Sequence, residues 1–184
     1  MDKKNMNKGA LWITRTAIFA ALLLVVQVGT APLSNTLITG SAVNMILIVS
    51  VMACGLSSGL AIATISPVLA KIVGIGPLWS LIPFIIFGNI VLVLLWHIIG
   101  NKSFGNNKFI SYTAAAVIAA VAKFGVLYVG VVKIAVPLVL KMEGKQAIMI
   151  STMFSVPQLI TALIGGAIAI AIVPVLKNAI AANG

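Results

Sequence analysis

Charged residues, and acidic residues above all, are scarce in this sequence of 184 residues. Asp and Glu together number 2, Lys and Arg number 12, and charged residues make up 8% of the chain. Soluble domains carry about 25% charged residues, because a folded chain of this size needs a polar surface towards water. The scarcity of charge therefore argues against a soluble enzyme, a disordered segment and a nucleic-acid-binding module.

Cysteine and histidine are nearly absent as well. The chain has 1 cysteine, Cys54, and 1 histidine, His97. A disulfide within the chain is excluded, and neither residue type forms a cluster with metal-site spacing. The sequence also lacks a GxxxxGK[ST] phosphate-binding motif and a Ser/His/Asp set. We therefore expect no catalytic residues, no metal site and no cofactor in this chain, and we interpret His97 as an interfacial residue.

Apolar residues dominate what is present. They make up 61% of the sequence, and the mean hydropathy is +1.22. A helix needs about 20 residues to cross about 30 Å of hydrocarbon, and the continuous apolar runs lack the alternation of a membrane β-barrel. The sequence predicts an all-α integral membrane protein, a six-transmembrane-helix bundle in a single domain over residues 1–184. The expected spans are 10–29, 37–54, 59–73, 78–99, 111–136 and 150–176, with a turn at 55–59.

The distribution of Lys and Arg predicts the orientation. Basic residues are enriched in cytoplasmic segments of membrane proteins, and we expect both termini in the cytoplasm. The N-terminal apolar stretch is long enough to span and lacks a convincing cleavage site, so we interpret it as a retained first helix. The expected cytoplasmic cations are Lys3, Lys4, Lys8, Arg15, Lys102, Lys108 and Lys177, against Lys71, Lys141 and Lys145 outside.

Lys123 lies near the middle of the fifth expected span. A charged side chain at this depth costs at least about 2.5–3.5 kcal/mol on insertion scales, and the only acids, Asp2 and Glu143, lie outside the spans. The amine must snorkel, lose its proton, contact carbonyl groups or meet an anion in a wet cavity. Because snorkelling is difficult from mid-depth, Lys123 is a candidate binding residue.

Other polar residues lie at similar depths. Asn44 and Asn89 each place an amide inside an expected span, and Gln158 follows Pro157, which disturbs its helix. These amides and the lysines are expected to converge on an outward-facing cavity. A stripe of small or polar residues at helical spacing runs through the last span, and its outer part includes Ser155 and Gln158; helix packing is the competing interpretation for its inner part.

The lack of acids inside the spans disfavours an ion-coupled secondary transporter. Two alternatives to a binding subunit stay open. One is a structural or accessory membrane protein that binds no ligand. The other is a self-sufficient facilitator that works without ATPase partners.

Several motifs together carry a resemblance to a known family. They are the uncharged loop 30–36, the run Thr-Gly-Ser-Ala-Val-Asn at 39–44, the glycine-bounded turn at 55–59 and the segment 83–89 with its closing Gly-Asn. Ala17 and Ala21 add an AxxxA pattern in the first span. Over nearly its whole length, the chain resembles the substrate-binding S-components of energy-coupling-factor (ECF) vitamin transporters.

The resemblance implies a mechanism and partners. An S-component of this family binds a vitamin-like small molecule in a pocket open to the outside, with the loop after the first helix as a lid. It joins a transmembrane coupling subunit and two cytoplasmic ATPases, which use ATP, and it topples in the bilayer to deliver its substrate. The family pattern assigns Ala17 and Ala21 to docking on the coupling subunit. The implied location is the bacterial plasma membrane, with multiple spans.

The position of family pockets suggests the site residues. A cavity with lysines and no acids favours an anionic or neutral ligand, such as the carboxylate vitamins pantothenate or nicotinate. Lys71 and Lys133 either contact the ligand or snorkel to the surface. The candidate substrate-binding residues are Asn35 and Asn44 from the lid region, with Asn89, Lys123, Tyr128, Lys133, Ser155 and Gln158.

Overall fold

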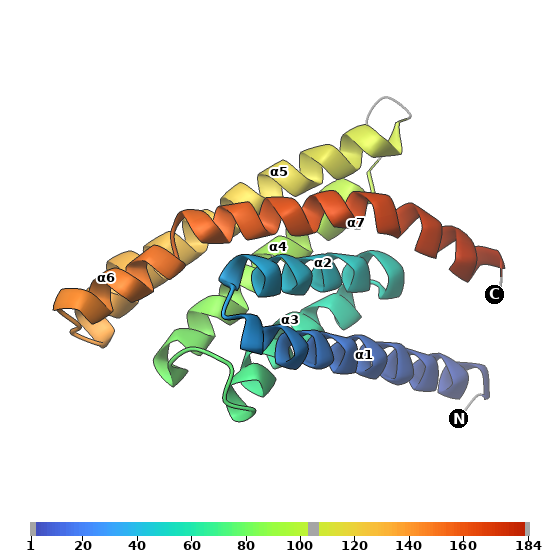
Figure 1. The fold of residues 1–184 in the computed structure, drawn as a ribbon. Coiled ribbons are helices and arrows are strands. Elements are labelled where there is room, and N and C mark those ends of the chain that lie inside the picture. The colour runs from blue at the N-terminus through green and yellow to red at the C-terminus, as the bar shows by residue number, and fades with distance from the viewer. Residues whose placement is uncertain (1–2, 103–106, 183–184) are drawn as a thin grey trace.

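The regular structure of the chain consists of helices (Figure 1). The computed structural model describes residues 3–102 and 107–182, and the side chains of residues 9–102 and 107–180. The side chains of Lys3, Lys4 and Lys8, part of the expected cytoplasmic charge, lie outside these ranges. The elements are α1 (Lys3–Thr30), η1 (Ala31–Leu33), α2 (Thr36–Cys54), α3 (Leu56–Ile72), η2 (Trp79–Leu81), α4 (Ile82–Gly100), α5 (Lys108–Leu127), the π-helix η3 (Tyr128–Val139), α6 (Gly144–Met153) and α7 (Val156–Ala182).

Within the described residues, 5 helical stretches are long and apolar enough to cross a membrane. The remaining apolar helix, α3, has 17 residues, which is at the short end of the range for a membrane span. The all-α membrane architecture expected from the sequence is therefore confirmed, with five long helices and a shorter sixth. The five long stretches are Gly9–Leu33, Thr36–Cys54, Trp79–Gly100, Lys108–Val139 and Gly144–Ile180.

The connection between α2 and α3 is tighter than the sequence suggested. Gly55 alone separates the two helices, and its φ of 89° lies in the region that favours glycine. Gly59, expected in the turn, instead lies inside α3, where an added Cβ would come within 2.6 Å of Val51. This glycine therefore serves the close packing of α3 on α2.

The last expected span, 150–176, is divided in the structure. The helix α6 ends at Met153, Phe154 and Ser155 form a break, and α7 begins at Val156. Pro157, at the second position of α7, has no N–H to offer to the preceding turn. The carbonyl of Met153 accepts a hydrogen bond from the Gln158 side chain instead (3.2 Å). The proline therefore explains why one apolar run becomes two helices.

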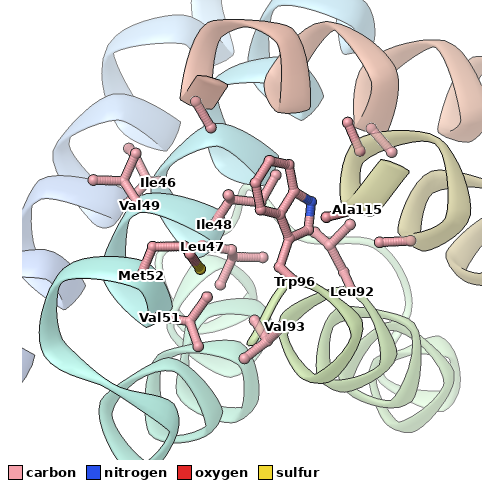
Figure 2. Packing of buried hydrophobic residues seen from close by; sticks show 14 of the residues in the cluster. Ile46, Leu47, Ile48, Val49, Val51, Met52, Leu92, Val93, Trp96 and Ala115 are labelled. Carbon is pink, nitrogen blue, oxygen red and sulfur yellow. The ribbon is translucent and has the colours of Figure 1, made fainter. Parts of the chain in front are cut away.

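The core lies where α2, α4, α5 and α7 meet. Trp96 of α4 is fully buried among Leu47, Ile48, Leu92 and Ala115, as Figure 2 shows. The helix α7 approaches this core closely at Gly166, whose added Cβ would lie 3.0 Å from Ala116 Cβ. The packed core fixes the positions of the four helices, all of which contribute residues to the site described below.

The first helix lies at the edge of the bundle, against α2 and α3. Its buried described side chains, Thr16, Leu23 and Gln27, lie on one face. The Thr16 hydroxyl donates to Ser58 Oγ of α3 (2.8 Å) and so ties the helices together. Ala17 and Ala21 are exposed. The small-residue pair is therefore free to meet another membrane helix.

Candidate functional site

Lys123 is the centre of a buried polar network. Its side chain is 3% exposed, and Nζ donates to Asn44 Oδ1 (2.6 Å) and Asn89 Oδ1 (2.7 Å). The three residues come from α5, α2 and α4, which are distant in sequence. Of the possibilities considered for this amine, contact with carbonyl oxygens is therefore observed. Hydrogen bonds from an ammonium to neutral acceptors stabilise its charge.

The Asn89 amide is held by a carbonyl group that a proline leaves free. Pro67 lies inside α3, and a proline in a helix has no N–H for the carbonyl four residues earlier. That carbonyl belongs to Ala63, and it accepts a hydrogen bond from Asn89 Nδ2 (3.5 Å). The bond turns the Asn89 oxygen towards Lys123, so the sequence of α3 helps to orient an acceptor on α4.

The Asn44 amide is held by α7. Its Nδ2 donates to Thr161 Oγ1 (3.3 Å), and the Thr161 hydroxyl donates to the carbonyl of Gln158 (3.1 Å). The helices approach closely here because of glycines: an added Cβ at Gly165 would lie 2.7 Å from the backbone oxygen of Ser41. Gly165 lies in the inner part of the small-residue stripe of the last expected span, and this contact fits the helix-packing interpretation of that part.

A cavity of about 410 Å³, called the central cavity below, lies beside the network. Lys123, Asn44 and Asn89 form part of its wall. Ligand sites for small organic molecules have volumes of about 300–1,000 Å³, so a vitamin-sized ligand fits. The remaining wall comes from the end of α1, the beginning of α2, the end of α3 with the loop that follows it, the beginning of α4, the end of α5 and the α6–α7 break. This is the end of the bundle away from both termini (Figure 1).

A second hollow of about 450 Å³ adjoins the central cavity. Its wall includes Lys71 and three methionines, Met142, Met149 and Met153. The two spaces share four wall residues, Gly76, Pro77, Met153 and Phe154. The loop after α3 and the α6–α7 break therefore form the partition between them.

The central cavity wall is basic. Lys123 is the one ionisable residue among its described wall residues, and no described Asp or Glu side chain contributes to that wall. Glu143, an exposed residue at the start of α6, lies outside it. An ammonium group has three N–H donors, and two of them reach amide oxygens. The third is available to a ligand.

Four of the expected site residues meet at the central cavity: Asn44, Asn89, Lys123 and Gln158. Asn35 does not line it. This residue is exposed and caps α2, with its Oδ1 accepting from the backbone N–H groups of Leu37 (2.9 Å) and Ile38 (3.4 Å). The Ser155 hydroxyl donates to the carbonyl of Ser151 and helps to form the α6–α7 break. Both residues have local structural roles.

Tyr128 and Lys133 lie on η3, away from the central cavity wall. Lys133 is exposed, and its Nζ lies 5.5 Å from the centre of the Tyr128 ring. This distance is typical of a cation–π contact, which satisfies the lysine at the surface without a ligand.

The structure adds wall residues that sequence reasoning missed, among them Gln27, Thr39 and Ser66. Gln27 is a lone amide near the end of the first apolar run, and Ser66 directly precedes Pro67. The reasoning that drew attention to Gln158, namely that an amide in an apolar helix needs a partner, applies equally to Gln27. Ser66 gives no comparable signal, because isolated serines are common in membrane helices.

The fold and the site define a class: an all-α, multi-pass membrane protein whose helices form a cavity with a polar network in its wall. A comparison with known protein families identifies the family within this class. The model of the ECF transporter substrate-specific component matches residues 12–177, and the chain belongs to this family. Members of the family are transporter subunits rather than enzymes, and they work with ECF coupling and ATPase subunits. No curated protein sequence and no solved structure matches the chain.

Proposed function

We propose that this chain binds a small organic anion in the central cavity and delivers it as the substrate-binding subunit of an ECF importer. The observation that carries the proposal is the position of Lys123, a buried cation in a cavity wall without acids. Asn44 and Asn89 hold the ammonium group in place and leave one donor for the ligand. A carboxylate vitamin such as pantothenate or nicotinate is the favoured ligand class.

The delivery step follows the family. With both termini in the cytoplasm, the end of the bundle that holds the central cavity faces outwards. The loop after α1 acts as the lid, and the exposed Ala17 and Ala21 dock on the coupling subunit. The loaded protein topples within the bacterial plasma membrane, and the two ATPases supply the energy. Close contact between helices at small residues supports this docking surface.

Acids and their neutral counterparts test the ligand class. Thermal shift measurements on the purified full chain would compare pantothenate with pantothenol, and nicotinate with nicotinamide. In whichever pair binds better, we expect the acid to bind at least about tenfold tighter than its neutral counterpart. The reason is that one charge-assisted hydrogen bond contributes about 1.5–3 kcal/mol. Equal binding of acid and neutral compound, or stabilisation by neither acid, would contradict the anionic ligand.

Transport separates an ECF subunit from a self-sufficient facilitator. We expect liposomes that contain this chain alone to take up none of the acid identified above, and liposomes that also contain the coupling subunit and ATPases to take it up in the presence of ATP. Uptake by the chain alone would favour the facilitator. Absence of binding in every assay would favour a structural membrane protein.

A further inference from the structure

Two polar atoms of the central cavity residues have no hydrogen-bond partner. They are Gln27 Oε1 and Ser66 Oγ. Gln27 is 8% exposed and Ser66 is 4% exposed, and both residues form part of the cavity wall. Buried polar atoms without partners are rare in folded proteins because each one destabilises the fold. Both residues belong to one cavity wall, where a bound molecule can supply the missing partner.

These two atoms lie on different helices from the cation. Gln27 belongs to α1 and Ser66 to α3, and these helices pack together. Lys123 belongs to α5, which runs on the far side of α2 and α7 from α1 (Figure 1). The central cavity wall therefore includes residues from the α5 side of the bundle and from the α1 side, and a ligand that fills the cavity lies between them.

The chemistry of the two sides differs. The ammonium group of Lys123 only donates hydrogen bonds, the amide oxygen of Gln27 only accepts them, and the Ser66 hydroxyl does either. A ligand complementary to both sides needs an acceptor with negative charge at Lys123. It also needs an N–H or O–H group at Gln27.

We infer that the ligand is an acid with a second, hydrogen-bond-donating group, and that Gln27 and Ser66 are the residues that recognise this group. The inference rests on the proposed function, since it takes Lys123 as the site of the acid. The presence or absence of such a donor group divides the carboxylate vitamins into two sets. Pantothenate and biotin carry N–H or O–H donors besides the carboxylate, whereas nicotinate and lipoate carry none.

Gln27→Met is the sharpest variant. Methionine has nearly the same length and shape as glutamine but accepts only weak hydrogen bonds. Without ligand, the variant loses an unpaired buried acceptor, so its melting temperature should equal or exceed that of the wild type. Its affinity for a donor-bearing acid should fall. A residue with a purely structural role would not move these two quantities in opposite directions.

Two pairs of acids provide the test. The matched pair is biotin and lipoate, which share a pentanoate arm and differ in the ring, a urea with N–H groups in biotin and a dithiolane in lipoate. Pantothenate, which has N–H and O–H donors, and nicotinate, which has none, form the second pair. Calorimetry on the purified full chain would measure all four acids against the wild type, Gln27→Met and Ser66→Ala. Gln146→Met is the control, because Gln146 is exposed and lies outside the central cavity wall.

We expect the donor-bearing acid of the better-binding pair to bind at least about tenfold tighter than its counterpart in the wild type. Gln27→Met and Ser66→Ala should each reduce this preference, and Gln146→Met should keep it. Tighter or equal binding of lipoate or nicotinate, or a preference unchanged in both cavity variants, would overturn the inference and leave the anion site intact. Failure of all four acids to bind, or equal acid binding by Lys123→Met, would contradict the proposed function and this inference with it.

Discussion

Lys123 Nζ lies 2.7 Å from Oδ1 of Asn89. The Asn89 amide is itself oriented by the Ala63 carbonyl, which Pro67 leaves without a helical partner. An irregularity in α3 thus prepares an acceptor on α4 for a cation on α5. The energetic consequences of this arrangement are measurable.

Asn89→Leu should destabilise the protein by about 1–3 kcal/mol, because the buried ammonium loses one of its two acceptors. In a Lys123→Met background the same substitution should cost much less, since no charge is left to satisfy. A double-mutant cycle of unfolding free energies in detergent measures the difference, and we expect a coupling of at least about 1 kcal/mol. Additive effects would mean that the two side chains do not stabilise one another.

The features that could be predicted from the sequence depend on how deep each residue lies in the membrane. Long apolar runs predicted the membrane helices, and the free-energy cost of a charge near the middle of the membrane identified Lys123 as a candidate. Asn44 and Asn89 were found for the same reason, as amides that need partners in an apolar environment. The structure joins all three.

The rest depends on which way each helix faces. In a membrane helix the lipid-facing and core-facing sides are both apolar, so periodicity does not reveal the inward side. Tyr128 and Lys133 were expected at the cavity, but they meet on its outside instead. Gln27 faces inwards from α1, a helix whose sequence drew attention only through Ala17 and Ala21. Burial of one face of α1 against α2 and α3 decides this, and such packing is a tertiary property.

Pro67→Ala should lower the affinity for the ligand without lowering the stability of the protein. The new N–H at position 67 would offer the Ala63 carbonyl its helical partner and compete with Asn89 Nδ2. We expect unchanged or higher stability, and an affinity for the bound acid that falls about three- to tenfold as the Asn89 oxygen loses its orientation. Thermal shift and calorimetry on one preparation measure both quantities.

Pro174→Ala is the matched control for that experiment. Pro174 also lies inside a helix, α7, but outside the central cavity wall. This variant should gain a helical hydrogen bond with no change in affinity. Equal losses of affinity in both proline variants would show that helix flexibility, rather than the Asn89 contact, determines binding.

The exposed face of α1 leads to a separate prediction about the coupling subunit as a partner. Ala17→Trp or Ala21→Trp adds a bulky ring where a small-residue pair lets another helix approach. Co-purification with the ECF coupling subunit should fall at least about tenfold, because close helix packing depends on such small residues, while acid binding should be unchanged. Val117→Trp, at an exposed position on α5, should assemble normally. Normal assembly of both α1 variants would exclude this face as the docking surface.

The most direct measurement is the identity of the small molecule that the purified protein retains. Native mass spectrometry of the full chain from cells grown in rich medium, followed by extraction, would compare the wild type, Lys123→Met and Lys145→Met. Lys145 is an exposed lysine outside the central cavity wall. We expect a small organic acid on the wild type and on Lys145→Met, and none on Lys123→Met. A neutral or cationic molecule on the wild type, or the same acid retained equally by Lys123→Met, would contradict an anion-binding cavity built around this lysine.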